Sequence, residues 1–356
     1  MTADQRSVLV VGPSWVGDMV HAQAFFMALQ DGPDDVAVDL VAPPAPFPLL
    51  ERIPEIREAF LLETRHGRLD LGARWRLARR LRERRYDQAY VLPSSFKAAL
   101  VPAFAGIPVR TAHLGEHRYG LINDVRPEVE ATRDRNLRGY LGLIRPDVGD
   151  AEAIPRPRLR VDAENQRELV ERLGLDPRAR VVALAPGAAG GPAKRWPVES
   201  FEALAALLAD QGRHVWVLGG PAEAALGEEI ARRSNGAVRN LCGRTTLTDA
   251  VDLLAMVETT VANDSGLAHV AAAAGSPVVV LFGPTSPDFS APLTDRSELV
   301  YLGLECSPCG KSTCPLGHHR CLRDIDVDEV ARRVDRLGER GSGTSGNGSS
   351  RTAPGS

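Results

Sequence analysis

The chain has 356 residues, of which 44% are hydrophobic and 25% are charged, and its formal net charge is −3. This length allows two domains with separate cores, and the composition is typical of a globular protein. The nearly balanced charge excludes a global attraction to nucleic acid, so we expect no nucleic-acid partner. The sequence contains no long apolar run and no basic leader segment, which predicts a cytoplasmic protein.

A strand followed by a glycine-containing loop opens the chain. Residues Ser7–Val11 are apolar, Gly-Pro-Ser-Trp-Val-Gly-Asp follows at 12–18, and a helix is expected over Met19–Gln30. The loop lacks the Gly-Lys-Ser/Thr of a Walker loop and the glycine spacing of a dinucleotide fingerprint. Asp18 is either the cap of this helix or a carboxylate directed into a cleft at the carboxyl end of the sheet.

Strands and helices continue to alternate in the first half, which predicts a parallel sheet covered on both faces. Further strand-like runs are Val36–Val41, Phe60–Leu62 and Gln88–Leu92. The helix expected over 71–85 carries seven arginines between Arg74 and Arg85. These arginines form either a solvated helix face or a patch that meets an anionic lipid or a phosphorylated glycan at the membrane surface.

A proline-containing segment at 146–157 separates this pattern from a second one of the same kind. The repetition predicts an α/β protein with two Rossmann-like, doubly wound domains that face a central cleft. We place the N-terminal domain at 1–155 and the C-terminal domain at 156–335. Residues 341–356 are rich in Gly, Ser and Thr, and we expect them to form a disordered tail.

Two charged residues follow strands of the second half. Lys194 ends a glycine-rich loop after the strand Val181–Ala185, and it is either a cation beside a bound diphosphate or a lone surface lysine. Glu223 follows the strand His214–Leu218. It either reaches the ribose hydroxyls of a nucleotide or favours the dipole of its own helix.

The stretch 261–283 predicts a strand, a tight loop, an Ala-rich helix and a second apolar strand at 278–282. The first N–H groups of a helix have no partner within it and carry the positive end of its dipole, so Ser265 and Gly266 mark a seat for phosphate. Asp264 is either the cap of this helix or part of the site. His269, one turn further, either donates to a diphosphate or packs as an ordinary helix histidine.

Four of the five cysteines lie close together, at Cys306, Cys309, Cys314 and Cys321. They could hold one structural zinc ion, although their spacing is not a common zinc pattern. The alternatives are reduced structural thiols and a redox pair. The grouping is not that of a secreted disulfide framework.

Several motifs together point to one family. They are Gly12–Met19, Tyr86–Pro93, Ser95–Lys97, Phe104–Pro108, Arg118–Arg126, Gly191–Pro197, Asn263–Val270 and Phe282–Pro287. With these motifs the chain resembles the lipopolysaccharide heptosyltransferases, most closely the ADP-heptose:LPS heptosyltransferase II type, over residues 7–335. In the donor loop Ala189 and Gly190 stand where some family members have hydroxyl residues.

The resemblance implies an inverting glycosyltransferase of GT-B architecture that requires no cofactor for catalysis. The implied donor is ADP-L-glycero-β-D-manno-heptose, and the implied acceptor is of the heptosyl-Kdo2-lipid A type, whose first heptose receives the second. Asp18 corresponds to the general base. The residues that correspond to the donor site are Ser14, Gly17, Lys194, Glu223, Asp264, Ser265, Gly266 and His269.

Two other functions remain open at this point: an ADP-heptose-dependent transferase with a natural-product acceptor, and a catalytically silent protein that binds sugar nucleotides. Retention of Asp18 and Lys194 speaks against the silent protein. We expect the N-terminal loops to decide the acceptor, with peripheral contact to the inner membrane. Candidates that could face a phosphorylated, acidic glycan are Arg110, His113, Glu116, His117 and Arg118.

Overall fold

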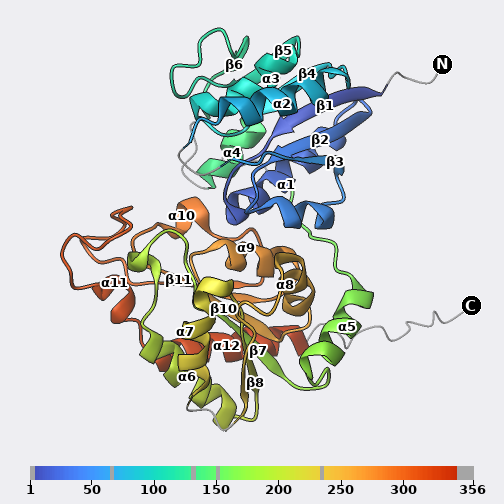
Figure 1. The fold of residues 1–356 in the computed structure, drawn as a ribbon. Helices are drawn as coiled ribbons and strands as arrows, with labels where there is room; N and C mark the ends of the chain where they lie inside the picture. The colour runs from blue at the N-terminus through green and yellow to red at the C-terminus, as the bar shows by residue number, and fades with distance from the viewer. Residues whose placement is uncertain (1–4, 65–67, 130–133, 150–152, 233–235, 343–356) are drawn as a thin grey trace, which may run out of the picture.

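The chain folds into two stacked halves, each built on one parallel β-sheet (Figure 1). The coordinates are those of a computed structural model. The structure describes residues 5–64, 68–129, 134–149, 153–232 and 236–342. No helix within these ranges combines the length and the apolar character needed to cross a bilayer.

The N-terminal half contains a six-stranded sheet in the order β3-β2-β1-β4-β5-β6, and all neighbouring strands are parallel. The strands are β1 (Arg6–Val11), β2 (Val36–Ala42), β3 (Ile56–Leu61), β4 (Gln88–Val91), β5 (Val109–His113) and β6 (Asp124–Arg126). The order reverses between β1 and β4, and in an open α/β sheet the ligand crevice forms at such a point. The loop after β1 therefore lies at the binding edge.

Helices cover both faces of this sheet, because Val8 and Val10 pack in the cluster of α1 whereas Leu9 packs in that of α2. The helices are α1 (Val16–Gln30), α2 (Leu71–Arg82), α3 (Leu100–Ala105) and α4 (Arg135–Gly142), with the 3₁₀ helices η1 (Phe47–Arg52) and η2 (Phe96–Ala99). Helix α2 is shorter than the predicted 71–85. Arg85 has a φ of 53°, a left-handed conformation that cannot continue a right-handed helix.

The C-terminal half repeats the design with the order β12-β11-β10-β7-β8-β9, again all parallel. Its strands are β7 (Val181–Ala185), β8 (His214–Val217), β9 (Val238–Asn240), β10 (Thr259–Asn263), β11 (Val278–Phe282) and β12 (Ser297–Tyr301). Here the order reverses between β7 and β10. The glycine-rich loop and the start of the Ala-rich helix follow these two strands, so they flank the same crevice.

Helices again surround the second sheet (Figure 1). They are α5 (Ala163–Leu173), α6 (Val198–Asp210), α7 (Ala224–Ala231), α8 (Leu247–Leu254), α9 (Gly266–Ala273), α10 (Pro287–Ser290), α11 (Arg320–Arg323) and α12 (Val327–Ser342), with η3 (Pro192–Lys194) and η4 (Pro221–Glu223). Because α12 continues to Ser342, the first two residues of the predicted tail at 341–356 are helical. The remainder of that tail lies outside the described residues.

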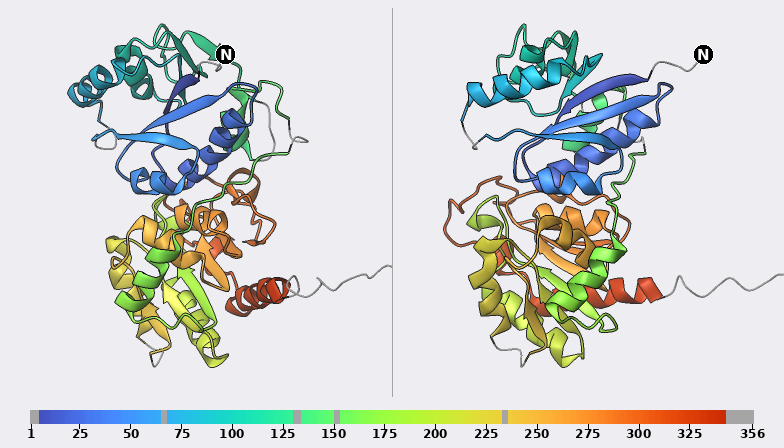
Figure 2. Two further views of the ribbon diagram at one scale, coloured as in Figure 1. Left: turned by 90° about the vertical axis from the view of Figure 1, so that its right-hand side faces the viewer. Right: turned by 45° about the vertical axis from the view of Figure 1, so that its right-hand side comes forward.

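The two halves are packed against each other through buried contacts. A single hydrophobic cluster contains Phe25 of α1 and Val270 of α9. Arg52 of η1 donates to Asp252 of α8 over 2.6 Å, and both side chains are buried. The predicted boundary between 155 and 156 lies within residues 153–162, which precede α5 and run between the two halves (Figures 1 and 2).

Candidate functional site

A cavity of about 620 Å³ lies between the two halves and brings together most of the predicted site residues. Its N-terminal wall comes from the first turns of α1, and its C-terminal wall from the glycine-rich loop, the start of α9 and the loop before α10. Seven predicted residues line it: Gly17, Asp18, Lys194, Asp264, Ser265, Gly266 and His269. We call this the cleft cavity.

Asp18 lies in the first turn of α1 without acting as its cap, because the N-cap position is Trp15 and no side chain caps the helix there. The carboxylate lines both the cleft cavity and a larger cavity in the N-terminal half. Burial raises the pKa of Asp18 above its ordinary 3.8, Lys194 opposes the shift, and Asp264 adds to it. A carboxylate with raised proton affinity between two cavities is suited to accept a proton during a reaction.

Lys194 and Asp264 form an ion pair on the C-terminal wall of the cleft cavity, with 2.7 Å between Nζ and Oδ2. Thr285 donates to the same carboxylate oxygen over 2.6 Å. Asp264 is only 5% exposed and makes none of the hydrogen bonds of a helix cap, so the capping alternative is wrong for this residue. The pairing also excludes a lone surface lysine, and it holds one positive charge at the cavity wall.

The start of α9 faces the same cavity through Ser265 and Gly266. Ser265 is the N-cap residue, yet its side chain makes no capping bond. Its buried Oγ has no hydrogen-bond partner among the described residues. The first N–H groups of α9 lie at the positive end of the helix dipole and are suited to receive an anion, whereas the Ser265 Oγ is buried.

His269 joins the two halves by packing on α1. A Cβ atom added to Gly17 would lie 2.7 Å from Cδ2 of His269, so this contact requires glycine. The ring of His21 meets that of His269 edge-on, with 4.4 Å between the ring centroids. Burial is the largest cause lowering the pKa of His21 to about 3 and of His269 to about 4, so both rings are neutral at physiological pH.

Sequence reasoning missed His21, which also lines the cleft cavity. The available signal was its position three residues after Asp18, since residues at this spacing share one face of a helix. Both ring nitrogens of His21 are buried, and the backbone of Ala291 lies close enough to act on the ring through a hydrogen bond. A neutral imidazole at this place adds polar atoms to the wall beside Asp18.

The His21–His269 pair should make the fold sensitive to acid. The unfolded chain binds protons at these rings near pH 6.5, but the folded rings do so only near 4 and 3. The contribution of the neutral pair to the free energy of unfolding is therefore fully present above pH 6.5. It is lost as the pH falls from 6.5 towards the folded-state pKa values of about 4 and about 3. We expect the melting temperature of His21→Phe to fall less steeply than wild type between about pH 7 and about pH 5.

The exposed His214 provides the matched control for this measurement. His214→Phe should keep the wild-type slope of melting temperature against pH, because this ring is exposed and lies outside the buried His21–His269 pair. Equal slopes for all three proteins would contradict a role of the buried pair.

Two predicted donor-site residues lie outside the cleft cavity. Ser14 lines the larger N-terminal cavity. Glu223 lines neither cavity; its Oε2 accepts the N–H of Gly220 over 2.9 Å, and its side chain lies against Gly187 of the glycine-rich loop. This hydrogen bond caps η4, and the contact of Glu223 with a ribose stays a prediction.

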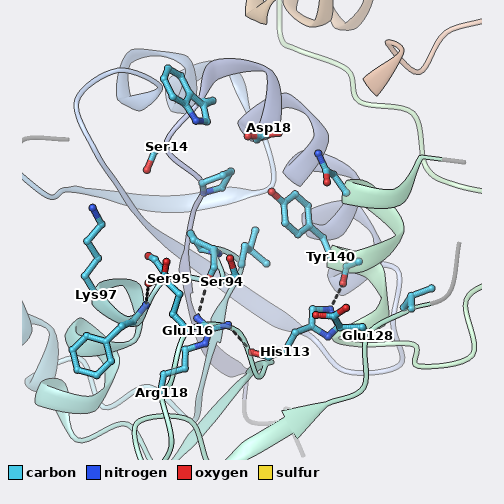
Figure 3. Close-up of a pocket in the computed structure, with 18 of the residues that line it drawn as sticks. Ser14, Asp18, Ser94, Ser95, Lys97, His113, Glu116, Arg118, Glu128 and Tyr140 are labelled. Atoms are coloured by element: carbon cyan, nitrogen blue, oxygen red, sulfur yellow. Dashed lines mark hydrogen bonds between the residues drawn. The ribbon is translucent and has the colours of Figure 1, made fainter. Parts of the chain in front are cut away.

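The larger cavity, of about 760 Å³, occupies the N-terminal half next to Asp18 (Figure 3). Three of the acceptor-loop candidates, His113, Glu116 and Arg118, lie on the side opposite Asp18 in this view. Arg118 is buried and donates to the carbonyl oxygens of Leu114, Pro93 and His113. Its guanidinium thus holds the loop together, and a contact of Arg118 with a glycan stays a prediction.

The other two acceptor-loop candidates do not line this cavity. Arg110 donates to the carbonyl oxygens of Leu121 and Ile107 over 2.6 Å each. His117 is exposed and has a φ of 26°. The prediction that these side chains face the glycan is therefore not supported for Arg110 and His117.

Lys97 is the cation that sequence reasoning missed in the larger cavity. It lies in η2 and lines this cavity, and no partner of its ammonium group is found among the described residues. The signal was present in the Ser-Phe-Lys motif at 95–97. Tyr140 of α4 also lines the cavity, and burial together with the nearby Asp18 raises its phenol pKa.

The four clustered cysteines are free thiols, each partly exposed. Within the described ranges, no group of three or more His, Cys, Asp or Glu side chains could hold a metal ion. All four are reduced in the described part of the chain, and the choice among structural thiols, a redox pair and a structural zinc site stays a prediction. Backbone N–H groups of residues 316–319 lower the pKa of Cys314, whereas burial and the other three thiols raise that of Cys321.

Comparison with known sequences identifies the family of this chain. The profile of glycosyltransferase family 9 (heptosyltransferase) matches residues 74–320. Lipopolysaccharide heptosyltransferase 2 of Escherichia coli K12 is 40% identical over 340 residues, covering 93% of this chain and 98% of the relative. Lipooligosaccharide heptosyltransferase 2 of Haemophilus influenzae is 37% identical over 347 residues, covering 93% and 99%.

Solved structures agree with the sequence relatives. The structure of E. coli ADP-heptose LPS heptosyltransferase II matches with a TM-score of 0.81 and 38% identity, covering 94% of this chain and 99% of that one. E. coli heptosyltransferase WaaC with ADP matches in fold, with a TM-score of 0.69 at 18% identity and coverage of 93% and 99%. These matches confirm the predicted GT-B fold. The chain therefore belongs to glycosyltransferase family 9, the heptosyltransferases, and is a glycosyltransferase.

Proposed function

We propose that the enzyme transfers L-glycero-D-manno-heptose from ADP-heptose to the lipopolysaccharide inner core, adding the second heptose to the first. The near-full-length relatives named heptosyltransferase 2 support this acceptor over a natural product. One observation carries the catalytic part of the proposal. Asp18 lies where the cleft cavity meets the larger cavity, in reach of both the donor and the acceptor side.

The donor occupies the cleft cavity in this proposal. ADP leaves with increasing negative charge as the bond between the anomeric carbon and the diphosphate oxygen breaks. Lys194 and the N–H groups at the start of α9 would stabilise that charge. Because Ala189 and Gly190 line the same wall, no hydroxyl side chain contributes at these two positions. Charge stabilisation by these groups requires no metal or other cofactor.

The acceptor occupies the larger cavity. Its hydroxyl attacks the anomeric carbon from the face opposite ADP, which inverts the configuration, and Asp18 takes up the hydroxyl proton. General base catalysis of this kind contributes a factor on the order of 10² to 10⁴. Lys97 would bind an acidic group of the inner-core glycan, since its ammonium group faces the cavity without a partner among the described residues.

The proposed substrates also suggest where the enzyme works. A nucleotide-activated donor is a cytoplasmic metabolite, and an acceptor built on lipid A is anchored in the inner membrane. We therefore place the enzyme in the cytoplasm, with peripheral contact to the inner membrane.

Release of ADP in the presence of EDTA tests this function. The enzyme is incubated with ADP-heptose and either heptosyl-Kdo2-lipid A or a panel of aminoglycoside and nucleoside natural products. Of these acceptors, we expect only heptosyl-Kdo2-lipid A to cause ADP release. The rate of release should be the same with and without EDTA. Faster release with a member of the panel would transfer the proposal to a small-molecule acceptor, and no release with any acceptor would favour a silent binding protein.

A further inference from the structure

The outer side of α2 carries exposed arginines together with exposed apolar side chains. Leu71 and Trp75 are 51% and 48% exposed, and Arg76, Arg79 and Arg80 are exposed as well. Helical spacing aligns Leu71, Trp75 and Arg79 along one stripe, with Arg76 and Arg80 beside it. We call these five residues the α2 surface. In both views of Figure 2, α2 lies at the periphery of the N-terminal half, away from the C-terminal half.

The arginines of the α2 surface differ from those of the other arginine-rich helix in their partners. Four arginines of α12 form ion pairs with Glu329 of the same helix or with Glu298 of β12: Arg332, Arg333, Arg336 and Arg340. No such pair involves Arg76, Arg79 or Arg80 within the described part of the chain. The α2 surface is therefore a patch of uncompensated positive charge on a protein whose net charge is −3. Its charge is complementary to an anionic partner.

The α2 surface continues into the mouth of the larger cavity. Leu69, just before α2, and Phe96 of η2 line that cavity and are 43% and 40% exposed. The buried Arg74 ties the two elements together, because Nε donates to the carbonyl oxygen of Leu69 over 2.7 Å and Nη1 to that of Lys97 over 2.9 Å. The apolar rim of the proposed acceptor site therefore adjoins the N-terminal end of the cationic helix.

We propose that the α2 surface docks on a bilayer that contains anionic phospholipid. The inference rests on the proposed function, since an acceptor anchored in a bilayer requires the cavity mouth to face that bilayer. Arginine guanidinium groups bind phosphate headgroups through two parallel hydrogen bonds. Trp75 and Leu71 supply the apolar side chains that enter the interface between headgroups and acyl chains. A soluble anion would use the arginines but leave this apolar pair exposed.

Sedimentation with lipid vesicles tests the docking directly. Wild-type enzyme should bind vesicles of phosphatidylcholine mixed with phosphatidylglycerol, and this binding should weaken at higher salt. It should bind vesicles of phosphatidylcholine alone weakly or not at all. The variant Arg76→Gln/Arg79→Gln/Arg80→Gln should partition at least about 30-fold less into anionic vesicles. Trp75→Ser should lower binding several-fold even at constant charge. Equal binding of wild type to both vesicle types would overturn the proposal.

A second charge variant serves as the matched control. Arg332→Gln/Arg336→Gln/Arg340→Gln removes the same number of positive charges from α12 and should bind anionic vesicles as wild type does. Equal losses from the two triple variants would mean that only the total charge matters, and would overturn a specific α2 surface.

Activity on two acceptors separates failure of the docking from failure of the proposed function. With heptosyl-Kdo2-lipid A in anionic vesicles, the α2 triple variant should turn over at least about tenfold more slowly than wild type. With the deacylated, water-soluble glycan, both proteins should have the same rate. A loss on both acceptors would assign the arginines to the glycan and overturn docking. Wild type inactive on both acceptors would refute the proposed function, while vesicle binding would still decide the docking.

Discussion

Replacing Asp18 with Asn should lower turnover at least about 100-fold while the affinity for ADP-heptose stays within a few-fold. An amide has nearly the shape of the carboxylate but cannot accept the hydroxyl proton of the acceptor. Because Asp18 lies at the wall shared by both cavities, its loss should affect the chemical step and leave the contacts of the donor with the C-terminal wall. Single-turnover rates and the dissociation constant of ADP-heptose measure the two effects separately.

The same substitution should leave the fold at least as stable as wild type at neutral pH. The pKa of Asp18 is raised, so the folded chain holds this proton more tightly than the unfolded chain does. Ionisation above this pKa therefore costs stability, and an amide avoids the cost. Asp31→Asn, at the exposed end of the same helix, is the control and should change neither turnover nor melting temperature. Turnover retained in Asp18→Asn would assign the base to another residue.

Replacing Lys194 with Gln should lower kcat/KM by about 100- to 1,000-fold, because one positive charge no longer stabilises the departing diphosphate. The affinity for ADP should fall by roughly tenfold or more, since a hydrogen bond to a charged group is lost. Steady-state kinetics and calorimetric titration with ADP measure these effects. Lys311→Gln, in the exposed cysteine-containing loop, is the matched control and should behave as wild type.

Removal of Lys194 also leaves the carboxylate of Asp264 without its cation. Asp264 is 5% exposed and keeps the hydrogen bond from Thr285, so we expect a loss of stability of about 1–3 kcal/mol. The double variant Lys194→Gln/Asp264→Asn should regain part of this stability but none of the activity. Recovery of activity in the double variant would show that Lys194 only neutralises Asp264 and does not act on the donor.

The sequence by itself determined the architecture and most of the cleft. Continuous apolar runs such as Val181–Ala185 and Val278–Phe282 predict strands buried on both faces, and both strands have these bounds in the structure. Glycine-rich loops after such strands indicate the binding edge, because the carboxyl ends of parallel strands meet there. Both signals, the apolar strand and the loop that follows it, can be read within a short segment of the sequence. Asp18, Lys194 and the start of α9 could therefore be predicted to lie around one cleft.

Only the tertiary structure decided which polar side chains have hydrogen-bond or ion-pair partners and which do not. Arg118 and Lys97 are both cations beside the larger cavity, yet Arg118 is held by three backbone carbonyl groups while the ammonium of Lys97 has no partner among the described residues. His21 and His269 meet through helices of different halves, far apart in the sequence. A side chain's partners depend on contacts between distant segments, and neither the periodicity nor the residue type of a single segment contains that information.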